Sequence, residues 1–387
     1  MIHPAPPLAL YVHLPWCVKK CPYCDFNSHP QRGALPFDAY VDALLADLDG
    51  DLRDFGGAAA GREIVSVFFG GGTPSLFPAD AIARLLDGVA ARLPMAAGAE
   101  VTLEANPGTL EHGRFEGYRA AGVNRLSIGV QSFDDAKLAR LGRIHSSGEA
   151  ERAVREARDA GFDNFNLDLM YALPQQDLAG ALADVERAIA LAPTHISHYQ
   201  LTLEPNTAFA ASPPPLPDHD DAWTMQEACQ ARLAAAGYAQ YEVSAYARDG
   251  RRCAHNLNYW RFGDYLAIGA GAHGKLSDAQ GVRRRWKLRH PTAYLKQAAT
   301  PARVGGDAYV PAAELPFEYM LNALRLVEGV PFGELAARTG LGEAAFAPAL
   351  DTAYARGWLE VADGRLRATA TGQRFLNDVI GLFLPAR

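Results

Sequence analysis

Residues 8–27 read LALYVHLPWCVKKCPYCDFN, an apolar run of β-forming residues followed by a loop with three cysteines. The run at 8–14 is the first of six strand candidates, and longer stretches of helical periodicity separate them. Strands that alternate with helices predict right-handed crossovers and parallel pairing. The pattern alone fits a β/α barrel or an open doubly wound sheet, and both place active sites at the carboxyl ends of their strands. The other strand candidates are 64–70, 100–106, 125–131, 165–173 and 195–203, and the helix candidates are 37–55, 79–93, 110–121, 148–160 and 178–191.

The bulk composition indicates a globular protein with a barrel-sized unit and a smaller one, because 387 residues exceed one ordinary domain. No uninterrupted apolar run is long enough to cross a bilayer, and the first residues lack the pattern of a secretory signal. We therefore expect a cytoplasmic protein without a transmembrane segment. A reducing cytoplasm keeps the five cysteines as thiols, which favours a ligand role for the clustered three. The net charge of −7 disfavours a broad nucleic-acid surface.

Three domains are expected along the chain. Residues 1–210 carry the alternating pattern and form the barrel core. The proline-rich stretch SPPPLPDHD (212–220) opens an extension of this core over residues 211–309. The extension is expected to hold a helix at 222–236, a strand at 241–246, and a loop-rich segment that includes the basic run RRRWKLR (283–289).

Residues 310–387 form the third expected domain. Three helical patterns precede a hairpin with a turn at Asp363-Gly364, which predicts a small winged-helix-like α+β unit. Seven arginines, no lysine and nine acidic residues leave this unit with a net charge of −2. That is the wrong sign for a phosphate-binding face, so no nucleic-acid partner is expected.

Cys17, Cys21 and Cys24 can converge on one metal centre only from a tight loop, and the proline between them keeps that loop out of helix and strand geometry. Zinc is one candidate, because structural zinc takes four protein ligands and His13 or His29 would complete the set. A four-iron cluster is the other candidate, in which three thiolates leave one iron open to a small molecule. The loop alone does not distinguish a zinc centre from a four-iron cluster.

A glycine run and three polar side chains follow later strand candidates. The glycines at 70–72 end the second candidate, where they expose backbone to a ligand or form a tight turn. Glu104, Gln131 and Asp168 end or closely follow further candidates, where their side chains can meet at one mouth. Each polar residue alone also fits a capping or salt-bridging role, so only the whole constellation favours a ligand site.

Several motifs resemble one family. The spacing Cys17-x3-Cys21-x2-Cys24, with Tyr23 before the last cysteine, and the run GGGTP (70–74) are similar to the radical S-adenosylmethionine (SAM) superfamily. The segments NRLSIGVQSF (124–133) and NLDLMYALP (166–174) resemble the oxygen-independent coproporphyrinogen III oxidase group, and within it the heme chaperone branch. The resemblance covers most of the chain. It implies a partial (β/α)6 TIM-like barrel of α/β class with a small C-terminal domain.

The resemblance implies a [4Fe–4S] cluster on Cys17, Cys21 and Cys24, with SAM as the ligand of the open iron. An electron from the reduced cluster would cleave SAM to a 5′-deoxyadenosyl radical, and a flavodoxin-type protein is the expected electron donor. No separate catalytic residue is implied. The residues expected to contact SAM are Tyr11, Tyr23, Gly71, Gly72, Thr73, Glu104, Gln131, Arg143 and Asp168, the last of them at the ribose hydroxyls.

Two positions separate the chaperone branch from the oxidases. The oxidases carry a further cysteine two residues after the third cluster cysteine, where this chain has Phe26. Oxidative decarboxylation of coproporphyrinogen III is therefore the alternative function. The sequence HNLNY (255–259) is similar to a heme-binding signature of the chaperone branch, which makes His255 the candidate axial ligand and Cys253 an alternative. Heme as a cofactor and acceptor hemoproteins as partners follow from this resemblance, and membrane-associated partners also fit.

Some of these residues also have plainer interpretations. Arg143 fits an ion pair with a neighbouring acid, and His255 fits a hydrogen-bonded loop histidine. The basic run at 283–289 fits a solvated face, or a site for heme propionates. Cys229 lies in an alanine-rich helical pattern and is expected in the core.

Overall fold

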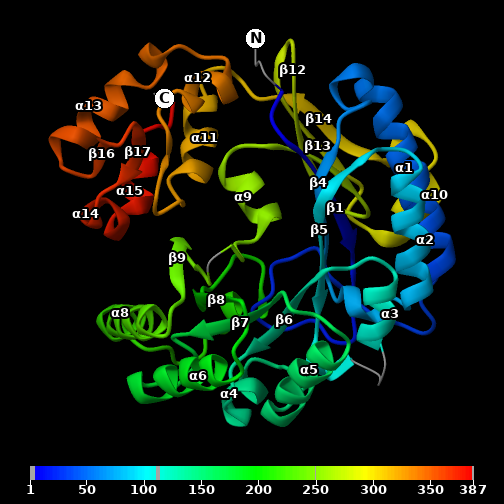
Figure 1. The fold of residues 1–387 in the computed structure, drawn as a ribbon, viewed down its shortest axis with the longest axis horizontal. Helices are drawn as coiled ribbons and strands as arrows, with labels where there is room; N and C mark the ends of the chain where they lie inside the picture. The colour runs from blue at the N-terminus through cyan, green and yellow to red at the C-terminus, as the bar shows by residue number, and fades with distance from the viewer. Residues whose placement is uncertain (1–4, 110–113, 249, 386–387) are drawn as a thin grey trace.

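The computed structural model describes residues 5–109, 114–248 and 250–385 (Figure 1). Its centre is a run of six parallel strands, each hydrogen-bonded to the next in chain order. Most residues of these strands are buried on both faces, which explains why their sequences are short apolar runs. The six predicted strands are confirmed as β1 (Leu8–Leu14), β4 (Ile64–Gly71), β5 (Met95–Ala105), β6 (Arg125–Gln131), β7 (Phe165–Tyr171) and β8 (His195–Gln200).

Helices connect these strands and cover the outer face of the sheet (Figure 1). In α1 (Phe37–Phe55), Tyr40, Leu44 and Leu48 are buried at the spacing of one helix face. The predicted helices are present, although residues 110–113 of one of them lie outside the described part. The others are α2 (Ala79–Ala90), α3 (Arg114–Ala120), α5 (Ser147–Asp159), α6 (Leu178–Ala190) and α8 (His219–Ala235). Cys229 of α8 is fully buried in the core, as expected.

Several short elements were not predicted. The helix α4 (Asp135–Arg140) was not predicted, because Leu138 is the only buried residue among its six and its sequence shows no helical periodicity of apolar residues. Two paired strands of two residues each, β2 (Trp16–Cys17) and β3 (His29–Pro30), frame the cysteine loop. The short helices are α7 (Ala208–Ala211), α9 (Ala254–Trp260) and α10 (Pro291–Gln297).

The segment expected to be loop-rich holds four strands instead. The first, β11 (Asp264–Ile268), pairs parallel with β1, and β12 (His273–Asp278), β13 (Gly281–Lys287) and β14 (Val304–Tyr309) continue antiparallel from it. At the opposite end, β10 (Ala245–Ala247) and β9 (Ala239–Glu242) follow β8. Together with the six central strands, these strands form one open sheet with β14 and β9 at its edges. This arrangement confirms the expected partial barrel.

Two cations of the basic run at 283–289 are buried, whereas Arg289 at its end is exposed. Arg285 is buried on β13 and donates to Asp51 of α1 at 2.8 Å. Lys287 is also buried, donates to Asp51 at 2.7 Å and contacts Asp47. These two cations therefore fasten the sheet extension to α1, and neither is free to meet a heme propionate.

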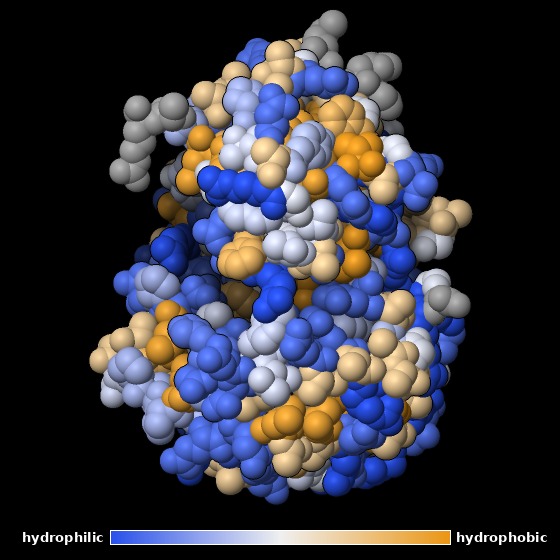
Figure 2. Space-filling view, turned by 90° about the vertical axis from the view of Figure 1, so that its left-hand side faces the viewer, coloured by the Kyte–Doolittle hydropathy of each residue, from blue (hydrophilic) through white to orange (hydrophobic). Residues whose placement is uncertain are grey.

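The C-terminal domain has its own hydrophobic core beside the sheet (Figure 1). Both residues of the Asp363-Gly364 turn have positive φ (51° and 71°), as a type I′ hairpin requires. The surface is indented between this domain and the end of the sheet near α8 (Figure 2). The domain holds α11 (Leu315–Ala323), α12 (Glu334–Thr339), α13 (Ala347–Ala355), α14 (Ala370–Arg374) and α15 (Leu376–Gly381), with a sheet of β15 (Val330–Pro331), β17 (Arg365–Ala368) and β16 (Leu359–Ala362). In the described ranges, no helix combines the length and apolar character needed to cross a membrane.

Candidate functional site

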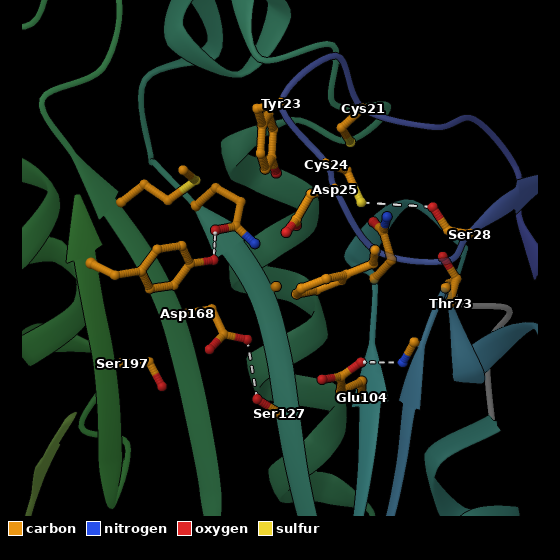
Figure 3. A pocket seen from close by; sticks show the side chains of 18 of the residues that line it. Cys21, Tyr23, Cys24, Asp25, Ser28, Thr73, Glu104, Ser127, Asp168 and Ser197 are labelled. Atoms are coloured by element: carbon orange, nitrogen blue, oxygen red, sulfur yellow. Dashed lines mark hydrogen bonds between the residues drawn. The ribbon is translucent and has the colours of Figure 1, made fainter. Parts of the chain in front are cut away.

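A cavity of about 540 Å³ opens at the carboxyl ends of strands β4 to β8 (Figure 3). The cysteine loop forms one wall, and side chains from the ends of β5, β6, β7 and β8 form the other. This is the end of the sheet at which the alternating sequence pattern placed the site. The predicted residues that line the cavity are Cys17, Cys21, Cys24, Tyr23, Gly71, Gly72, Thr73, Glu104, Gln131, Arg143 and Asp168.

The cysteine loop holds its thiols beside polar groups. Cys17 is buried, while Cys21 and Cys24 are partly exposed along the cavity. The Ser28 hydroxyl lies 3.6 Å from Cys24 Sγ, and the Arg143 guanidinium donates to Cys21 Sγ at 3.8 Å. Burial raises the pKa of Cys17, and hydrogen bonds from neighbouring hydroxyls oppose that rise. Donors of this kind stabilise thiolates, so the loop suits cysteines that act as ligands.

The donor set fits a cluster with an open iron better than a closed zinc site. All three thiols are free of disulfide bonds. His13 Nε2 donates to the Asn27 carbonyl at 3.0 Å, and Nδ1 accepts from the Tyr11 hydroxyl at 2.9 Å. His29 is absent from the cavity wall and packs against His290. The loop thus brings three thiols to the cavity, and neither predicted histidine completes a tetrahedral zinc site with them.

Gly71 and Gly72 let the chain pass close to the cysteine loop. Gly71 has a φ of +115°, and a Cβ at this position would lie 2.4 Å from the His13 ring. A Cβ on Gly72 would lie 2.5 Å from the Trp16 carbonyl oxygen. No side chain fits at such distances, so glycine is required here by the packing itself. The tight-turn interpretation therefore holds, and the exposed backbone still lines the cavity.

Two carboxyl groups face the cavity from β5 and β7. Glu104 accepts a hydrogen bond from the Gly71 amide at 3.2 Å, and Asp168 accepts from Ser127 Oγ at 3.1 Å (Figure 3). Asp168 also accepts from Asn166 Nδ2 at 2.8 Å. Burial, reinforced by the charge of Asp168, raises the pKa of Glu104 to about 8. Burial also raises the pKa of Asp168, although its hydrogen bonds oppose the shift. A ligand with cationic groups would relieve this repulsion, and the ammonium and sulfonium groups of SAM meet that requirement.

Arg143 and Gln131 brace the cavity wall next to the cysteine loop. Arg143 Nη2 donates to the Gly129 carbonyl at 2.7 Å, while Nη1 faces Cys21. Its partners are thus a carbonyl and a thiol rather than the neighbouring acid of the plainer interpretation. Gln131 accepts from the Tyr199 hydroxyl of β8 at 2.8 Å, which ties β6 to β8 across the cavity.

The structure does not bring Tyr11 or His255 to the cavity. The Tyr11 hydroxyl turns to His13 instead. His255 is 1% exposed, and its ring nitrogens are hydrogen-bonded to Ser66 Oγ at 2.9 Å and to the Tyr259 hydroxyl at 2.8 Å. Burial lowers the pKa of His255 to about 3, so the ring is neutral. In this arrangement His255 matches its plainer interpretation as a hydrogen-bonded histidine.

The next residues around α9 do reach the cavity, since Asn256 and Trp260 line it. The orientation of this helix depends on Glu100 of β5, whose carboxylate accepts from the amides of Ala254 and His255 at 3.1 Å each. Cys253, the alternative heme ligand, is 1% exposed, and its thiol points to the same carboxylate at 3.4 Å.

Sequence reasoning missed part of the cavity wall. Ser127 of β6 and Ser197 of β8 point into the cavity (Figure 3). Gln131 of β6 and Tyr199 of β8 also line it, at even spacing along the same strands. The alternation of side chains along a strand would have identified them once one inward residue of each strand was known. Further missed lining residues are Asp25, Ser28, Glu204, Glu242 and Ser244.

Comparison with known proteins covers both parts of the chain. Residues 11–187 match the Radical SAM superfamily, and residues 310–375 match the HemN C-terminal domain. The heme chaperone HemW of Escherichia coli (strain K12) is 52% identical over 380 residues, which are 98% of each chain. The chain belongs to the HemW family of the radical SAM superfamily.

Other HemW proteins support the same assignment. HemW of Haemophilus influenzae is 50% identical over 98% of each chain, and HemW of Mycobacterium tuberculosis (strain H37Rv) is 37% identical over 98% of this chain and 96% of its own. The solved structure of coproporphyrinogen III oxidase (HemN) from Escherichia coli superposes with a TM-score of 0.82 over 99% of this chain and 91% of its own, at 23% identity. This likeness confirms the fold, a partial barrel with a C-terminal domain. The family predicted from the sequence motifs is also confirmed.

Proposed function

We propose that this protein is a radical SAM heme chaperone, which binds heme and transfers it to acceptor hemoproteins in the cytoplasm. In this proposal Cys17, Cys21 and Cys24 hold a [4Fe–4S] cluster and SAM occupies the adjoining cavity. The observation that carries the proposal is the cavity itself, which sets three free thiols opposite two enclosed carboxyl groups in a member of the HemW family. When bound, the cluster and SAM supply one-electron chemistry that side chains alone cannot provide.

The walls of the cavity have separate roles in this proposal. Ser28 and Arg143 stabilise thiolates of the cysteine loop. Glu104 neutralises a cationic group of SAM, and Asp168 accepts hydrogen bonds from ribose hydroxyls. Tyr199 holds Gln131 in place, which keeps the wall between these carboxyl groups rigid. The protein thus orients SAM and keeps water away from it.

Heme binding is proposed at α9, beside the cavity. His255 is the proposed axial ligand, and ligation requires its ring to exchange one hydrogen bond for iron. The Tyr259 hydroxyl is hydrogen-bonded to Nε2 of His255, so a variant without that hydroxyl leaves Nε2 free to bind iron. Asn256 and Trp260 line the cavity, so bound heme would contact the cavity through this helix.

Anaerobic reconstitution tests the cluster and SAM. The parent protein should bind one [4Fe–4S] cluster per chain, Cys21→Ser should lose it, and Cys229→Ser in the core of α8 should keep it. SAM should change the electron paramagnetic resonance spectrum of the reduced cluster, and Asp168→Asn should require a higher SAM concentration for the same change. A zinc centre, or a cluster whose spectrum ignores SAM, would contradict the proposal.

Optical titration with heme tests His255. His255→Ala should lose the spectrum of ligated heme, and Tyr259→Phe should bind heme about fivefold more tightly, the worth of one hydrogen bond of about 1 kcal/mol. Tyr241→Phe is a control for the loss of a buried tyrosine–histidine hydrogen bond, because its hydroxyl lies 2.8 Å from Nε2 of His195; this hydroxyl also accepts from the Cys253 amide at 3.3 Å. An identical spectrum and affinity in all variants would remove His255 as the ligand.

A turnover assay separates the chaperone from the alternative oxidase. The chaperone should bind heme stoichiometrically and form no protoporphyrinogen from coproporphyrinogen III under anaerobic reducing conditions. The motivating observation is Phe26, which stands where the oxidases have a further cysteine. Repeated turnover by the reconstituted parent protein would establish the oxidase instead.

A further inference from the structure

A chain of buried hydrogen bonds runs from Asp168 at the cavity to the start of α9. Asn166 Nδ2 donates to the Asp168 carboxylate at 2.8 Å, and Asn166 Oδ1 lies 2.6 Å from Nδ1 of His195. On the other side of this ring, Nε2 lies 2.8 Å from the Tyr241 hydroxyl, whose oxygen accepts from the Cys253 amide at 3.3 Å. Cys253 immediately precedes α9, so the chain joins one wall of the cavity to the helix at which heme binding is proposed.

All hydrogen bonds of this chain point in the same direction. Burial, with a smaller contribution from the charge of Arg125, lowers the pKa of His195 well below its usual value, so the ring is neutral and carries one hydrogen. The amide oxygen of Asn166 can only accept, which places that hydrogen on Nδ1 and leaves Nε2 to accept from Tyr241. Each group thus donates toward the carboxylate at the cavity, beginning with the backbone amide at the start of α9.

The interior of the protein shields this chain from water. Asn166, His195, Tyr241 and Cys253 are each 1% exposed, whereas the Asp168 carboxylate faces the cavity (Figure 3). In such surroundings hydrogen bonds are strong, and the members of a chain polarise one another. A change at the carboxylate is therefore felt at the start of α9.

At its other end, the chain holds α9 in the position that keeps His255 buried. The Glu100 carboxylate accepts from the first amides of the helix, and the Tyr241 hydroxyl accepts from the amide just before it. Heme iron cannot reach a ring that is 1% exposed unless α9 moves. Ligation by His255 therefore disturbs these attachments, including the last hydrogen bond of the chain.

We infer that SAM bound at Asp168 and heme bound at His255 oppose each other through this chain of hydrogen bonds. The inference rests on the proposed function, which places SAM at Asp168 and heme at α9. Ribose hydroxyls fix the Asp168 carboxylate in one orientation and so order the chain, whereas heme ligation displaces α9 and breaks it. SAM thus prefers the state with α9 in place, and its binding favours the release of heme.

Optical titration with heme, with and without SAM, tests the inference. The reconstituted protein is kept with its cluster oxidised, so that SAM is not cleaved. Saturating SAM should weaken heme binding by about fivefold, at the lower end of typical couplings between two sites, and heme should weaken SAM binding by the same factor. The effect should level off as SAM saturates, whereas direct competition for one space would raise the apparent Kd for heme without limit.

Substitutions of His195, a positioning residue that lies between the two sites, test the route. His195→Leu should bind each ligand alone but lose the effect of SAM on heme affinity. His195→Gln keeps one donor and one acceptor and should retain part of the effect. His198→Leu is the matched control, because His198 is also buried on β8 but stacks on Tyr171, and it should retain the full effect.

Hydrogen exchange gives a second readout that needs no heme. SAM should slow exchange at the first amides of α9 several-fold in the parent protein and in His198→Leu, but not in His195→Leu. This measurement separates loss of the route from a general loss of stability, which would speed exchange throughout the sheet with and without SAM.

The possible failures are distinct. A heme affinity that saturating SAM leaves unchanged or increases, an effect that never levels off, or equal coupling in His195→Leu and the parent would overturn this inference alone. Loss of the coupling in His198→Leu as well would also overturn it. A parent protein that fails to bind SAM or heme would overturn the proposed function, and this inference with it.

Discussion

Glu104 should link proton binding to the proposed binding of SAM in the cavity. A group with a pKa of about 8 is roughly nine-tenths protonated at pH 7. Cationic groups of SAM stabilise the carboxylate, so SAM binding at pH 7 should release close to one proton. The affinity for SAM should consequently rise with pH below 8 and level off above it.

Calorimetry in two buffers with different ionisation enthalpies measures this proton. Glu104→Gln should abolish the dependence of the binding enthalpy on the buffer and should weaken SAM binding. Gln131→Glu is not a suitable control, because it adds a new charge to the cavity. A binding enthalpy that is independent of buffer in the parent protein would show that Glu104 keeps its protonation state.

Asn27 fastens the end of the cysteine loop to the sheet extension. Its amide donates to the carbonyls of Ala270 at 2.9 Å and Arg289 at 2.8 Å, and its own carbonyl accepts from His13. Asn27→Ala removes two hydrogen bonds worth about 1 kcal/mol each and frees the loop. We expect the reconstituted cluster to be lost several-fold faster to a chelator, as followed by its visible absorption.

Asn124 offers a matched control for this prediction. Its side chain also bridges two backbone groups, the Val101 amide and the Ala99 carbonyl, at 2.8 Å each. Asn124→Ala should lower the stability of the fold to a similar extent and leave the rate of cluster loss unchanged. Equal rates in both variants would mean that Asn27 has only a general structural role.

At the scale of elements, β13 and α1 are joined by a buried ionic network. Lys287 lies between Asp47 and Asp51, and Arg303 donates to the same two aspartates at 3.0 and 3.3 Å. Lys287→Met leaves buried carboxylates short of a cation and should cost about 3 kcal/mol in the free energy of unfolding. Denaturant titration measures this loss.

Two further variants make the prediction specific. Asp47→Asn/Lys287→Met removes one negative charge along with the lysine and should recover part of the lost stability. Arg84→Met breaks ion pairs with Asp38 and Asp42 on the exposed side of α1 and should change stability little. A small effect of Lys287→Met alone would show that Arg303 suffices for the network.

The same network explains which elements could be predicted from the sequence. Four of the six central strands, β1, β4, β6 and β7, were predictable because most of their residues are buried, which makes their sequences largely apolar. The strand β13 was not, because its sequence, GVRRRWK, is strongly basic, and Arg285 pairs with Asp51, 234 residues away. No local pattern contains that pairing.

Part of the candidate site could likewise be predicted from the sequence, and part of it could not. Motif spacing and strand ends placed the thiols, the glycines and both carboxyl groups at one cavity. They could not give the orientation of α9, because Glu100 fixes this helix from β5 through hydrogen bonds to its first amides. His255 is therefore turned away from the cavity, and Trp260 lines it instead.

At the scale of the molecule, Glu328 connects the C-terminal domain to the helix at the cavity. It pairs with Arg252 at 3.0 Å and Arg261 at 3.5 Å, which flank α9, and with Arg365 of β17 at 3.5 Å. Glu328→Gln should loosen this contact and speed hydrogen exchange in α9 by about threefold, without effect on β4 to β7.

Glu360→Gln is the control for this prediction. Its partner, Arg367, lies 2.7 Å away within the same hairpin, so the pair does not reach α9. Mass spectrometry of exchanged peptides should show faster exchange in α9 only for Glu328→Gln. Faster exchange throughout the sheet would indicate general destabilisation instead.

Some backbone groups of the outermost strand β9 are paired with the segment that follows α11. Tyr241 accepts a hydrogen bond from the amide of Val327, and Glu242 bridges Leu326, so the segment after α11 covers part of this border. Uncovered borders of β-sheets recruit strands from other molecules and begin aggregates. Deleting the last 78 residues, 310–387, would uncover this border, so the shortened chain should self-associate. The segment after α11 thus covers part of a sheet border at which separate copies of the protein could otherwise pair.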